Sequence, residues 1–406
     1  MKVLVINTGS SSIKYRLFDM KGIQVLAEGL VERIGQEGSS IHHKVYKNGS
    51  TDSFTQTEPV PDHRTGLNRI AALLTDSKYG SVKTSDEIEA VGHRVVHGGE
   101  DFHNPALITD DIIAAIKKNI PLAPLHNPAN LTGIEVARMV FSGAKHIAVF
   151  DTAFHQTMKP YSYMYAIPFE MYENFRIRKY GFHGTSHGFV SQEAADHLGK
   201  DRKTLNMITI HLGNGSSMAA IKQGICVDTT MGLTPLAGLM MGTRCGDLDP
   251  AVPFFLAENN SCTIERIDTM LNKKSGLYGI CGKNDMREIL QNMEQGCEKS
   301  RLAVEMLTYQ IKKYIGAYYA ALGRLDVMIF TAGIGENVPL IRKLACENLE
   351  ELGIHIDNDR NNDTGKGIRI ISSADSRVTV LVVPTNEELK IARDVKTVLE
   401  EISGQK

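Results

Sequence analysis

The sequence predicts an α/β protein with two similar halves, and three observations lead to this fold class. Short apolar runs rich in β-branched residues recur along the 406 residues, each followed by a turn or a helical pattern. Amphipathic helical patterns lie between these runs, and such alternation is typical of α/β proteins. Two pairs of segments also resemble each other in the same order, which indicates an internal duplication with a cleft between the copies.

The predicted elements follow from these patterns. Apolar, β-branched runs predict strands at 2–7, 88–96, 146–151, 206–212, 326–333 and 378–386. Long amphipathic patterns predict helices at 111–120, 300–322 and 386–402.

The duplication rests on two internal similarities. Residues 3–22 and 208–224 both read as a strand, a Gly/Ser turn, a second strand and a polar hairpin. Residues 146–154 and 326–334 both read as an apolar strand that ends in a turn of small residues.

Composition excludes several functional classes. With 45 Lys+Arg against 47 Asp+Glu, the net charge of −2 does not indicate nucleic acid or an anionic membrane as a partner. The amino-terminal apolar run is too short for a signal peptide, and no transmembrane stretch follows, so we expect a cytoplasmic protein. The scattered cysteines contain no CxxC pair, which predicts free thiols. They are Cys226, Cys245, Cys262, Cys281, Cys297 and Cys346.

Three glycine-containing turns follow apolar strands, at 7–14, 211–217 and 331–337. Backbone N–H groups and hydroxyls in such turns can bind phosphate. The alternative for each is a tight hairpin that needs glycine for its backbone conformation. None fits the P-loop or the dinucleotide-binding fingerprint, but three such turns in one chain favour a nucleotide ligand.

Several charged residues lie where chemistry is possible. Arg94 is on a valine-rich strand and Arg244 is in a glycine-flanked turn; each could be half of an ion pair, or bind carboxylate and phosphate oxygens. Asp151 ends an apolar strand, where it could bind a metal–phosphate complex, act in catalysis or cap the next helix. Glu387 could simply offset the dipole of a helix that it opens. His126 precedes a predicted helix start and could bind an anion or cap backbone.

The octet YGFHGTSH at 180–187 places His183 and His187 four residues apart. It lacks the glutamate of a HExxH zinc motif and the GxSxG elbow that would expose Ser186 as a nucleophile. The following apolar pattern predicts a helix that begins with Thr185 or Ser186 as N-cap and ends at Gly199. His183 would then lie just before the helix, able to hydrogen-bond a phosphoryl group, and His187 would be structural.

Ten segments in order along nearly the whole chain together resemble the acetate kinase (acetokinase) family. They are VLVINTGSSSIKY, GHRVVHGGE, APLHNPAN, VFDTAFHQTM, RKYGFHGTSH, HLGNGSS, PLAGLMMGTRCGDLDP, NKKSGLYGI, FTAGIGEN and VPTNEE. The resemblance implies the sugar kinase, Hsp70 and actin superfamily, with two ribonuclease H-like domains and an active-site cleft between them. The domains would be 1–150 with 386–406, and 151–385, the second binding nucleotide and forming a homodimer.

The implied reaction is a reversible, direct in-line transfer of the ATP γ-phosphoryl group to acetate, with Mg²⁺ or Mn²⁺. The resemblance implies that five residues are catalytic: Arg94, His126, Asp151, His183 and Arg244. It implies metal binding by Asn7 and Glu387. It implies an acetate site of Arg94, Val96, Leu125, Phe182 and Pro235. It implies a nucleotide site of Ser10, Ser12, Lys14, His211, Leu212, Gly213, Asn214, Gly215, Asp285, Met286, Arg287, Gly333, Ile334, Gly335, Glu336 and Asn337.

The sequence also departs from the family pattern. Lys283, Asn284 and Glu288 differ from the residues usual around the adenine-side segment, which leaves the nucleotide base preference open. Val96 stands where propionate-preferring relatives tend to have alanine, which favours acetate.

Two alternatives remain: a propionate or butyrate kinase of the same fold, and an Hsp70- or actin-like ATPase. Against the second, the chain ends shortly after PTNEE, leaving no room for a peptide-binding domain. The two arginines would also have no evident purpose in a filament.

Overall fold

The computed structural model describes residues 1–47, 49–124, 126–260 and 262–404, which divide into two compact units. Unit 1 comprises Met1–Ala153 and the segment from Asn386 onward, and unit 2 comprises Phe154–Thr385. Residues 151–153, which we expected in the second domain, belong to unit 1. The six cysteines are free thiols, as predicted. Within the described ranges, no helix combines the length and apolar character needed to span a bilayer.

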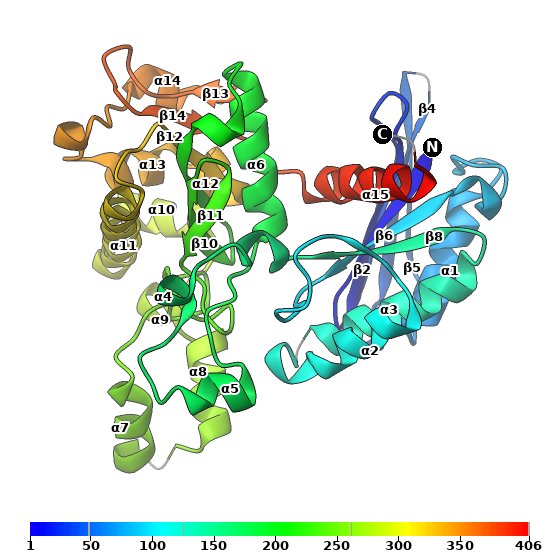
Figure 1. The fold of residues 1–406 in the computed structure, drawn as a ribbon, viewed down its shortest axis with the longest axis horizontal. Helices are drawn as coiled ribbons and strands as arrows, with labels where there is room; N and C mark the ends of the chain where they lie inside the picture. The colour runs from blue at the N-terminus through cyan, green and yellow to red at the C-terminus, as the bar shows by residue number, and fades with distance from the viewer. Residues whose placement is uncertain (48, 125, 261, 405–406) are drawn as a thin grey trace. The chain divides into compact units, whose positions relative to one another are not determined.

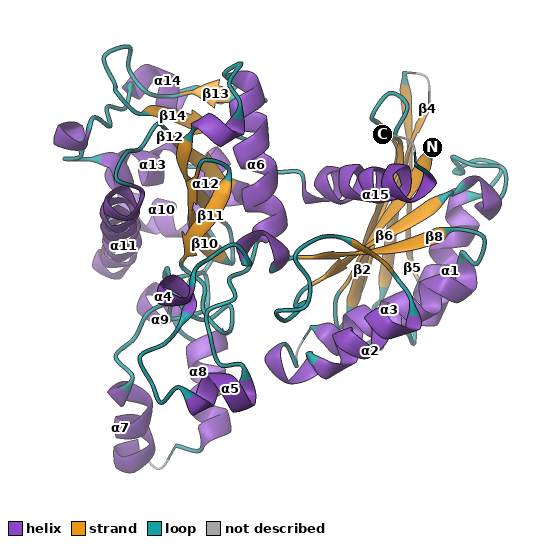
Figure 2. Cartoon of the chain, viewed as in Figure 1, coloured by secondary structure: helices purple, strands orange, loops and turns teal. Residues whose placement is uncertain are grey.

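Unit 1 contains an eight-stranded sheet with the order β5-β4-β3-β2-β1-β6-β8-β7 (Figures 1 and 2). Strands β1 to β5 pair antiparallel, whereas β1, β6 and β8 run parallel. The strands are β1 (Lys2–Thr8), β2 (Ser12–Asp19), β3 (Gln24–Glu32), β4 (Ser40–Lys47), β5 (Ser50–Thr57), β6 (Ala90–Val95), β7 (Ala106–Leu107) and β8 (Lys145–Phe150). The sequence analysis did not predict β3, β4 and β5.

Helices cover both faces of this sheet, because alternate residues of each strand point to opposite faces. Leu4 and Ile6 of β1 pack in a core that α1 (His63–Leu74) and α3 (Asn127–Val140) complete, whereas α2 (Asp110–Lys118) packs beside α3 in a separate apolar cluster. Val3 and Val5 face α15 (Glu387–Ser403) instead. A Cβ at Gly92 would lie within 2.8 Å of methyl groups on α15, so glycine allows the helix this close to β6.

Unit 2 contains a six-stranded sheet with the order β11-β10-β9-β12-β14-β13. Strands β9, β12 and β14 run parallel, and β10, β11 and β13 pair antiparallel with their neighbours. The strands are β9 (Asn206–Leu212), β10 (Ser216–Lys222), β11 (Ile225–Thr229), β12 (Val327–Thr331), β13 (Arg369–Ile370) and β14 (Thr379–Val382).

The two faces of β9 differ in chemistry. Ile208, Ile210 and Leu212 pack in an apolar core against α11 (Glu298–Leu322) and its neighbouring helices. Thr209 and His211 lie on the opposite face and hydrogen-bond side chains of α6 (Gly184–His197). The remaining helices are α4 (Pro160–Tyr163), α5 (Glu170–Phe175), α7 (Ala251–Asn260), α8 (Ile264–Lys273), α9 (Gly276–Cys281), α10 (Met286–Glu294), α12 (Ala332–Asn337), α13 (Pro339–Cys346) and α14 (Asn358–Asn362).

The topology supports the predicted duplication. Both sheets contain the same six-strand order, because β3-β2-β1-β6-β8-β7 in unit 1 matches β11-β10-β9-β12-β14-β13 in unit 2. The first internal similarity is correct, since it aligns β1 and β2 with β9 and β10. The second is wrong, because it aligned β8 with β12, whereas β12 occupies the position of β6 and the counterpart of β8 is β14.

Candidate active site

Three charged side chains of unit 1 meet where β6, β8 and α15 come together. Arg94 is near the end of β6, Asp151 directly follows β8, and Glu387 is the first residue of α15. Parallel neighbouring strands place Arg94 and Asp151 at the same sheet edge, and Arg94 Nη2 lies 3.0 Å from Asp151 Oδ2. Arg94 Nε lies 3.7 Å from Glu387 Oε2. Arg94 therefore bridges two carboxylates.

Burial makes this group electrostatically sensitive. Asp151 is fully buried, and the side chains of Arg94 and Glu387 are 18% and 25% exposed. Burial opposes the charge on Arg94, but Asp151 and Glu387 outweigh it and raise the pKa of the guanidinium. Burial raises the pKa of Glu387 to about 7; Arg94 opposes this change, whereas Asp151 adds to it. Glu387 is thus poised to gain or lose a proton near neutral pH.

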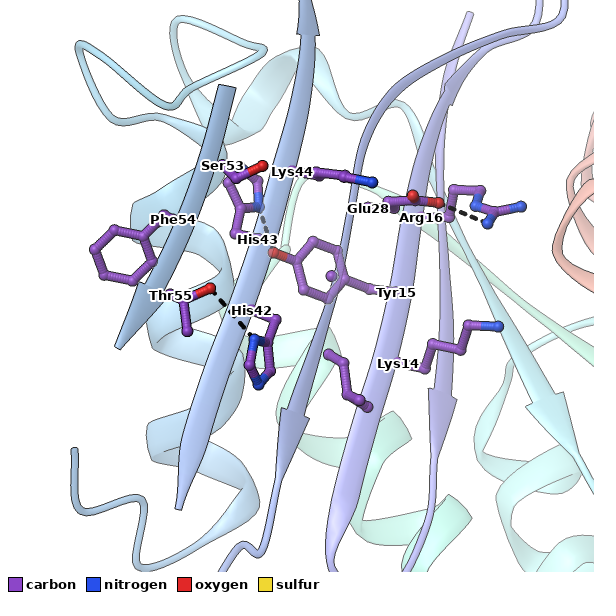
Figure 3. Close-up of a pocket in the computed structure, with 12 residues that line it drawn as sticks. Lys14, Tyr15, Arg16, Glu28, His42, His43, Lys44, Ser53, Phe54 and Thr55 are labelled. Carbon is purple, nitrogen blue, oxygen red and sulfur yellow. Dashed lines mark hydrogen bonds and ion pairs between the residues drawn. The ribbon is translucent and has the colours of Figure 1, made fainter. Parts of the chain in front are cut away.

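Lys14 lies beside this group, on the solvent-facing side of β2. Its Nζ is 2.5 Å from Glu388 Oε1, and the neighbouring Arg16 pairs with Glu28 at 2.6 Å. Lys14, Arg16 and Glu28 border a hollow of about 430 Å³ on the face of strands β2 to β5 (Figure 3). Asn7 is the cross-strand partner of Lys14 in the β1–β2 ladder. Ser10 lies in the connecting turn and Ser12 begins β2.

Unit 2 gathers a second set of residues around the start of α6. His183 occupies the N-cap position with φ +56°, in the left-handed region that few residues other than glycine adopt. The predicted cap at Thr185 or Ser186 is wrong, because the helix starts at Gly184 and both residues are buried in its first turn. The sequence could not reveal this start, since a left-handed histidine has no sequence signature. His183 does directly precede the helix, as predicted.

Hydroxyls and imidazoles form a network beneath His183. His183 Nδ1 lies 2.9 Å from Ser217 Oγ, and His187 Nε2 lies 2.8 Å from the same oxygen. The His183 ring stacks on His211 with 4.3 Å between ring centroids. His211 Nδ1 in turn lies 2.8 Å from Ser186 Oγ. In the described ranges, no three His, Cys, Asp or Glu side chains form a group able to hold a metal ion, so the zinc alternative for this octet gains no support.

Gly215 has no side chain, and the position that a Cβ would occupy lies near two groups that are cationic or can become so. A Cβ at this position would lie 3.3 Å from His183 Nε2 and 3.5 Å from Arg244 Nη1. Gly215 belongs to the turn between β9 and β10, in which the Gly213 N–H donates to the Gly215 carbonyl. The loop that carries Arg244 is tied to this turn, because the Gly242 N–H donates to the Asn214 carbonyl at 3.1 Å. The predicted turn at 211–217 is confirmed.

Arg244 has an unusual environment for a charged residue. Its Nη1 lies 3.4 Å from the Pro235 carbonyl and 3.8 Å from Met241 Sδ, and it forms no ion pair with a carboxylate in the described part of the chain. Burial lowers the pKa of the guanidinium, and no acid among the described residues counteracts this change. An anion in the space beside Gly215 would provide the missing charge.

The segment predicted as a third glycine-containing turn is a short helix, α12. It follows β12, and Ala332 opens it with φ +64°. Glu336 Oε1 accepts hydrogen bonds from the Ala332 N–H at 2.8 Å and the Thr385 N–H at 3.0 Å. The turn prediction was therefore wrong, because residues 332–337 form a helix and Glu336 accepts from its first N–H group. Gly333, Ile334, Gly335 and Asn337 complete the helix.

The adenine-side segment has mixed accessibility. Asp285 caps α10 and pairs with Arg287, whose side chain is 90% exposed. Hydrogen bonds from Arg287 lower the pKa of Asp285 to about 2. The Met286 side chain is instead buried in the apolar core, so only its backbone could contact a ligand.

The remaining predicted residues lie in both units. In unit 1, Val96 is buried just after β6, and His126 precedes α3. In unit 2, Phe182 is buried and Pro235 is partly exposed. Leu125, predicted to contact acetate, lies outside the described residues.

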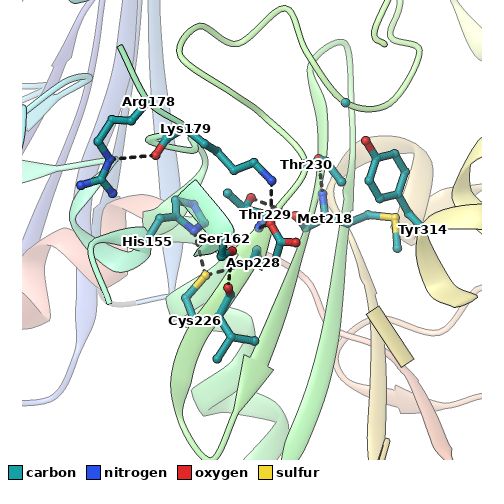
Figure 4. A network of polar contacts seen from close by, with 12 residues as sticks. His155, Ser162, Arg178, Lys179, Met218, Cys226, Asp228, Thr229, Thr230 and Tyr314 are labelled. Atoms are coloured by element: carbon teal, nitrogen blue, oxygen red, sulfur yellow. Dashed lines mark hydrogen bonds and ion pairs between the residues drawn. The ribbon is translucent and has the colours of Figure 1, made fainter. Parts of the chain in front are cut away.

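The sequence analysis missed several residues that support these groups. Glu388 is adjacent to a predicted residue, and Ser217 ends the HLGNGSS segment, so both lie in or beside motifs that the sequence analysis identified. His155 lies in another quoted segment, VFDTAFHQTM: its Nε2–H donates to the Phe182 carbonyl at 2.9 Å, and its Nδ1 lies 3.2 Å from Cys226 Sγ (Figure 4). Burial raises the pKa of Cys226, so the thiol keeps the proton that it can donate to His155.

The unit 1 group gives a direct prediction. Glu387 should titrate with a pKa of about 7 in the protein without ligands. Arg94→Leu removes the cation that holds this value down, so the pKa of Glu387 should rise further. ¹³C NMR of carboxyl-labelled glutamate measures the change, and Arg287→Leu in unit 2 is the control that should leave it unaltered. An unchanged or lower pKa in Arg94→Leu would contradict the ion pair.

Comparisons with known proteins show the family of this chain. The chain matches the acetokinase family over residues 2–393. Acetate kinase of Thermotoga maritima is 53% identical over 405 residues, covering 99% of this chain and 100% of that protein. The acetate kinase of Oleidesulfovibrio alaskensis is 52% identical over 400 residues, covering 98% and 100%.

Solved structures give the same result. Porphyromonas gingivalis acetate kinase superposes with a TM-score of 0.93 at 46% identity, covering 98% of this chain and 99% of that one. A propionate kinase from Francisella tularensis superposes with a TM-score of 0.90 at 40% identity, with the same coverage. These matches confirm the resemblance that the sequence motifs carried. The chain belongs to the acetokinase family.

Proposed function

We propose that this protein catalyses the reversible transfer of the γ-phosphoryl group of ATP to acetate, giving acetyl phosphate and ADP. The observation that carries the proposal is the space beside Gly215, which His183 Nε2 and Arg244 Nη1 both face. Such a space suits the equatorial oxygens of a phosphoryl group in transfer. Membership of the acetokinase family and the acetate kinases among its relatives support the choice of acetate.

The reaction requires the protein mainly to align the two substrates and to stabilise the negative charge on the phosphoryl oxygens. An acetate carboxylate is already a competent nucleophile, so neither a general base nor a covalent intermediate is required. We assign Arg94 to the acetate carboxylate, and Arg244 and His183 to the phosphoryl oxygens. His126 is assigned to the same anionic groups. Fixed donors of this kind stabilise the charge that spreads over the phosphoryl oxygens, and they need no reorganisation during the step.

The carboxylates of unit 1 suit a divalent cation. Asp151 and Glu387 share one guanidinium, and burial raises the pKa of Glu387, a penalty on its negative charge that a bound cation would offset. We propose that Asp151, Glu387 and Asn7 hold Mg²⁺, directly or through water, since this ion prefers oxygen ligands and retains several waters. When bound, Mg²⁺ (or Mn²⁺) would neutralise phosphate charge. Asp151 would keep Arg94 oriented, and Glu387 would have to lose its proton.

We assign nucleotide binding to three segments of unit 2 and to the β1–β2 turn. The segments are 211–215, 285–287 and 333–337, and the turn supplies Ser10, Ser12 and Lys14. The exposed Arg287, held by Asp285, is free to contact ribose or base from its outer side. The base preference stays open, because Lys283, Asn284 and Glu288 differ from the pattern of the resemblance.

A hydroxamate assay with acetate, ATP and Mg²⁺ tests the reaction itself. The protein should form acetyl phosphate, and Gly215→Ala should lower kcat by roughly 100-fold or more, because the added methyl group fills the phosphoryl space. The KM for ATP should change much less. Gly316→Ala, in a helix with no atom within 4 Å of the new methyl group, is the matched control.

A second variant guards against a merely structural effect of the methyl group. His183→Ala should also lower kcat far more than it alters ATP binding. Absence of acetyl phosphate with the wild-type protein would refute the function, and normal turnover by both variants would refute the assigned phosphoryl position.

Acyl chain length gives a separate prediction. Val96 and Phe182 are 5% and 3% exposed, and we assign both to the pocket for the acetate methyl group. Acetate should have a higher kcat/KM than propionate, by roughly 10-fold to 200-fold for the extra methylene. Val96→Ala should narrow this ratio by enlarging the pocket. A wild-type preference for propionate would instead favour the activity named for the Francisella tularensis relative.

We propose that a second copy of the chain covers α7. Its sequence, AVPFFLAENN, is apolar, yet none of residues 251–259 is fully buried, and Phe254 and Phe255 are 70% and 62% exposed. Ile264 on α8 is also 80% exposed. Apolar surface of this extent on neighbouring helices indicates an interface, and closed two-fold dimers are the commonest assemblies. The homodimer expected from the family resemblance supports this choice of partner.

Light scattering with size-exclusion chromatography tests this interface. The wild-type protein should elute as a dimer, and the double variant Phe254→Glu/Phe255→Glu should shift toward the 44.7 kDa monomer. Ile402→Glu, at an exposed apolar position of unit 1, should remain dimeric. A wild-type monomer, or a dimer that survives the double substitution, would exclude α7 as the contact.

A further inference from the structure

His183 sits on a backbone that its surroundings hold in a strained conformation. Gly181 and His183 both have positive φ, at +78° and +56°. The His155 Nε2–H donates to the Phe182 carbonyl between them, and a Cβ at Gly181 would lie 2.7 Å from the His155 ring. A left-handed histidine persists only where neighbours over-determine it. The backbone of His183 is therefore fixed before any ligand binds.

A chain of four polar side chains fixes the imidazole as well. It runs from His183 Nδ1 to Ser217 Oγ at 2.9 Å, from Ser217 Oγ to His187 Nε2 at 2.8 Å, and from His187 Nδ1 to Thr209 Oγ1 at 2.7 Å. Ser217, His187 and Thr209 are fully buried. Thr209 Oγ1 also lies 3.5 Å from the Ala219 carbonyl, which can only accept.

The number of hydrogen atoms available to these four side chains decides in which direction their hydrogen bonds run. Burial, and then nearby histidines, lower the pKa of His187 well below its ordinary value, so this ring is neutral and carries one N–H. Ser217 has one hydrogen and can donate it to only one of its two imidazole neighbours. If Thr209 donates to the Ala219 carbonyl, the His187 Nδ1–H donates to Thr209. Ser217 then donates to His187 Nε2 and accepts from the His183 Nδ1–H.

Between His183 Nδ1 and the Ala219 carbonyl, this direction makes four hydrogen bonds, whereas the reverse direction makes three and gives nothing to that carbonyl. Buried polar groups are satisfied in native proteins, so the fuller arrangement is preferred. We infer that Ser217 is a positioning residue that holds His183 as its Nδ1–H tautomer. The inference rests on the proposed function of His183, since it states how that residue is prepared for the phosphoryl group.

The tautomer has a mechanistic consequence at Nε2, the nitrogen that faces the space beside Gly215. In the neutral ring, Nε2 carries a lone pair and would repel a phosphoryl oxygen. His183 can donate there only after Nε2 gains a proton, which makes the ring an imidazolium. The Ser217 oxygen then stabilises the cation by accepting from Nδ1–H. The groups near His183 are the guanidinium of Arg244, the His211 ring and the neutral His187 ring, and a phosphoryl anion would balance the guanidinium and the imidazolium.

Nitrogen NMR of the ¹⁵N-histidine-labelled protein tests the tautomer directly and without substrates. At alkaline pH, His183 and His187 should both show a protonated Nδ1 and a bare Nε2. Ser217→Ala should allow His183 to populate the Nε2–H tautomer. Ser191→Ala, which removes another fully buried hydroxyl that donates to the Gly188 carbonyl, is the matched control and should leave both rings unaltered.

Kinetics supply the second readout. Ser217→Ala should lower kcat by about 10-fold to 100-fold, as loss of a partner that orients an active group commonly does. Its KM for ATP should stay within about 2-fold, and the alkaline limb of the kcat profile should move to lower pH, because the imidazolium has lost an acceptor. A purely structural role would lower activity without moving this limb.

The outcomes separate the two proposals. If the wild-type protein forms no acetyl phosphate, the proposed function fails, while the NMR measurement still decides the tautomer. An Nε2–H tautomer of His183 in the wild-type protein would overturn the inference even if Ser217→Ala does not fold. An alkaline limb that stays in place in folded Ser217→Ala would overturn it as well.

Discussion

The buried ion group of Arg94, Asp151 and Glu387 is the interaction on which the rest of unit 1 depends. It joins two parallel strands to a helix from the far end of the chain, and each charge is tolerable only because the others are near. Removing one member of a buried pair typically costs about 3–5 kcal/mol, since it leaves an uncompensated charge. The parallel pairing of β6 with β8 and the close packing of α15 on Gly92 are both needed to bring these groups together.

Unit 2 repeats the strand order but not the chemistry. Where unit 1 places carboxylates around an arginine, unit 2 surrounds His183 with hydroxyls and imidazoles and leaves Arg244 without a carboxylate in the described part of the chain. The first arrangement suits a cation, and the second suits an anion. Duplication therefore supplied one scaffold twice, and side chains at different, non-equivalent positions of the two copies gave each copy its own charge preference.

The sequence predicted the strands whose apolar composition reflects their burial in the structure. Apolar strands such as β1, β9 and β12 are buried on both faces, so their composition is unambiguous. Strand β5, read as SFTQT near its end, is largely exposed at a sheet edge and has no such signal. The false match of β8 with β12 arose because an apolar strand followed by small residues is a common pattern at the ends of parallel strands.

Some of the site residues could be predicted from the sequence, and others could not. Arg94, Asp151 and Glu387 could be singled out because charged residues at the ends of apolar segments are unusual, and the structure brings them together. The helix start at His183 was not predictable, because its left-handed backbone is imposed by tertiary contacts such as the one from His155. Ser217 was overlooked because a serine on a buried strand acquires its role only from its contacts, here the imidazoles at the start of α6.

The division of unit 1 into two separate stretches of sequence affects how the protein is made. Helix α15 covers Val3 and Val5 and supplies Glu387, yet it follows the whole of unit 2 in the chain. During synthesis, one apolar face of the first sheet and the guanidinium of Arg94 must wait until all intervening residues have emerged from the ribosome. The nascent chain therefore exposes an apolar surface for most of its translation, and chaperones bind surfaces of this kind. The group of Arg94, Asp151 and Glu387 would be complete only once α15 has been synthesised.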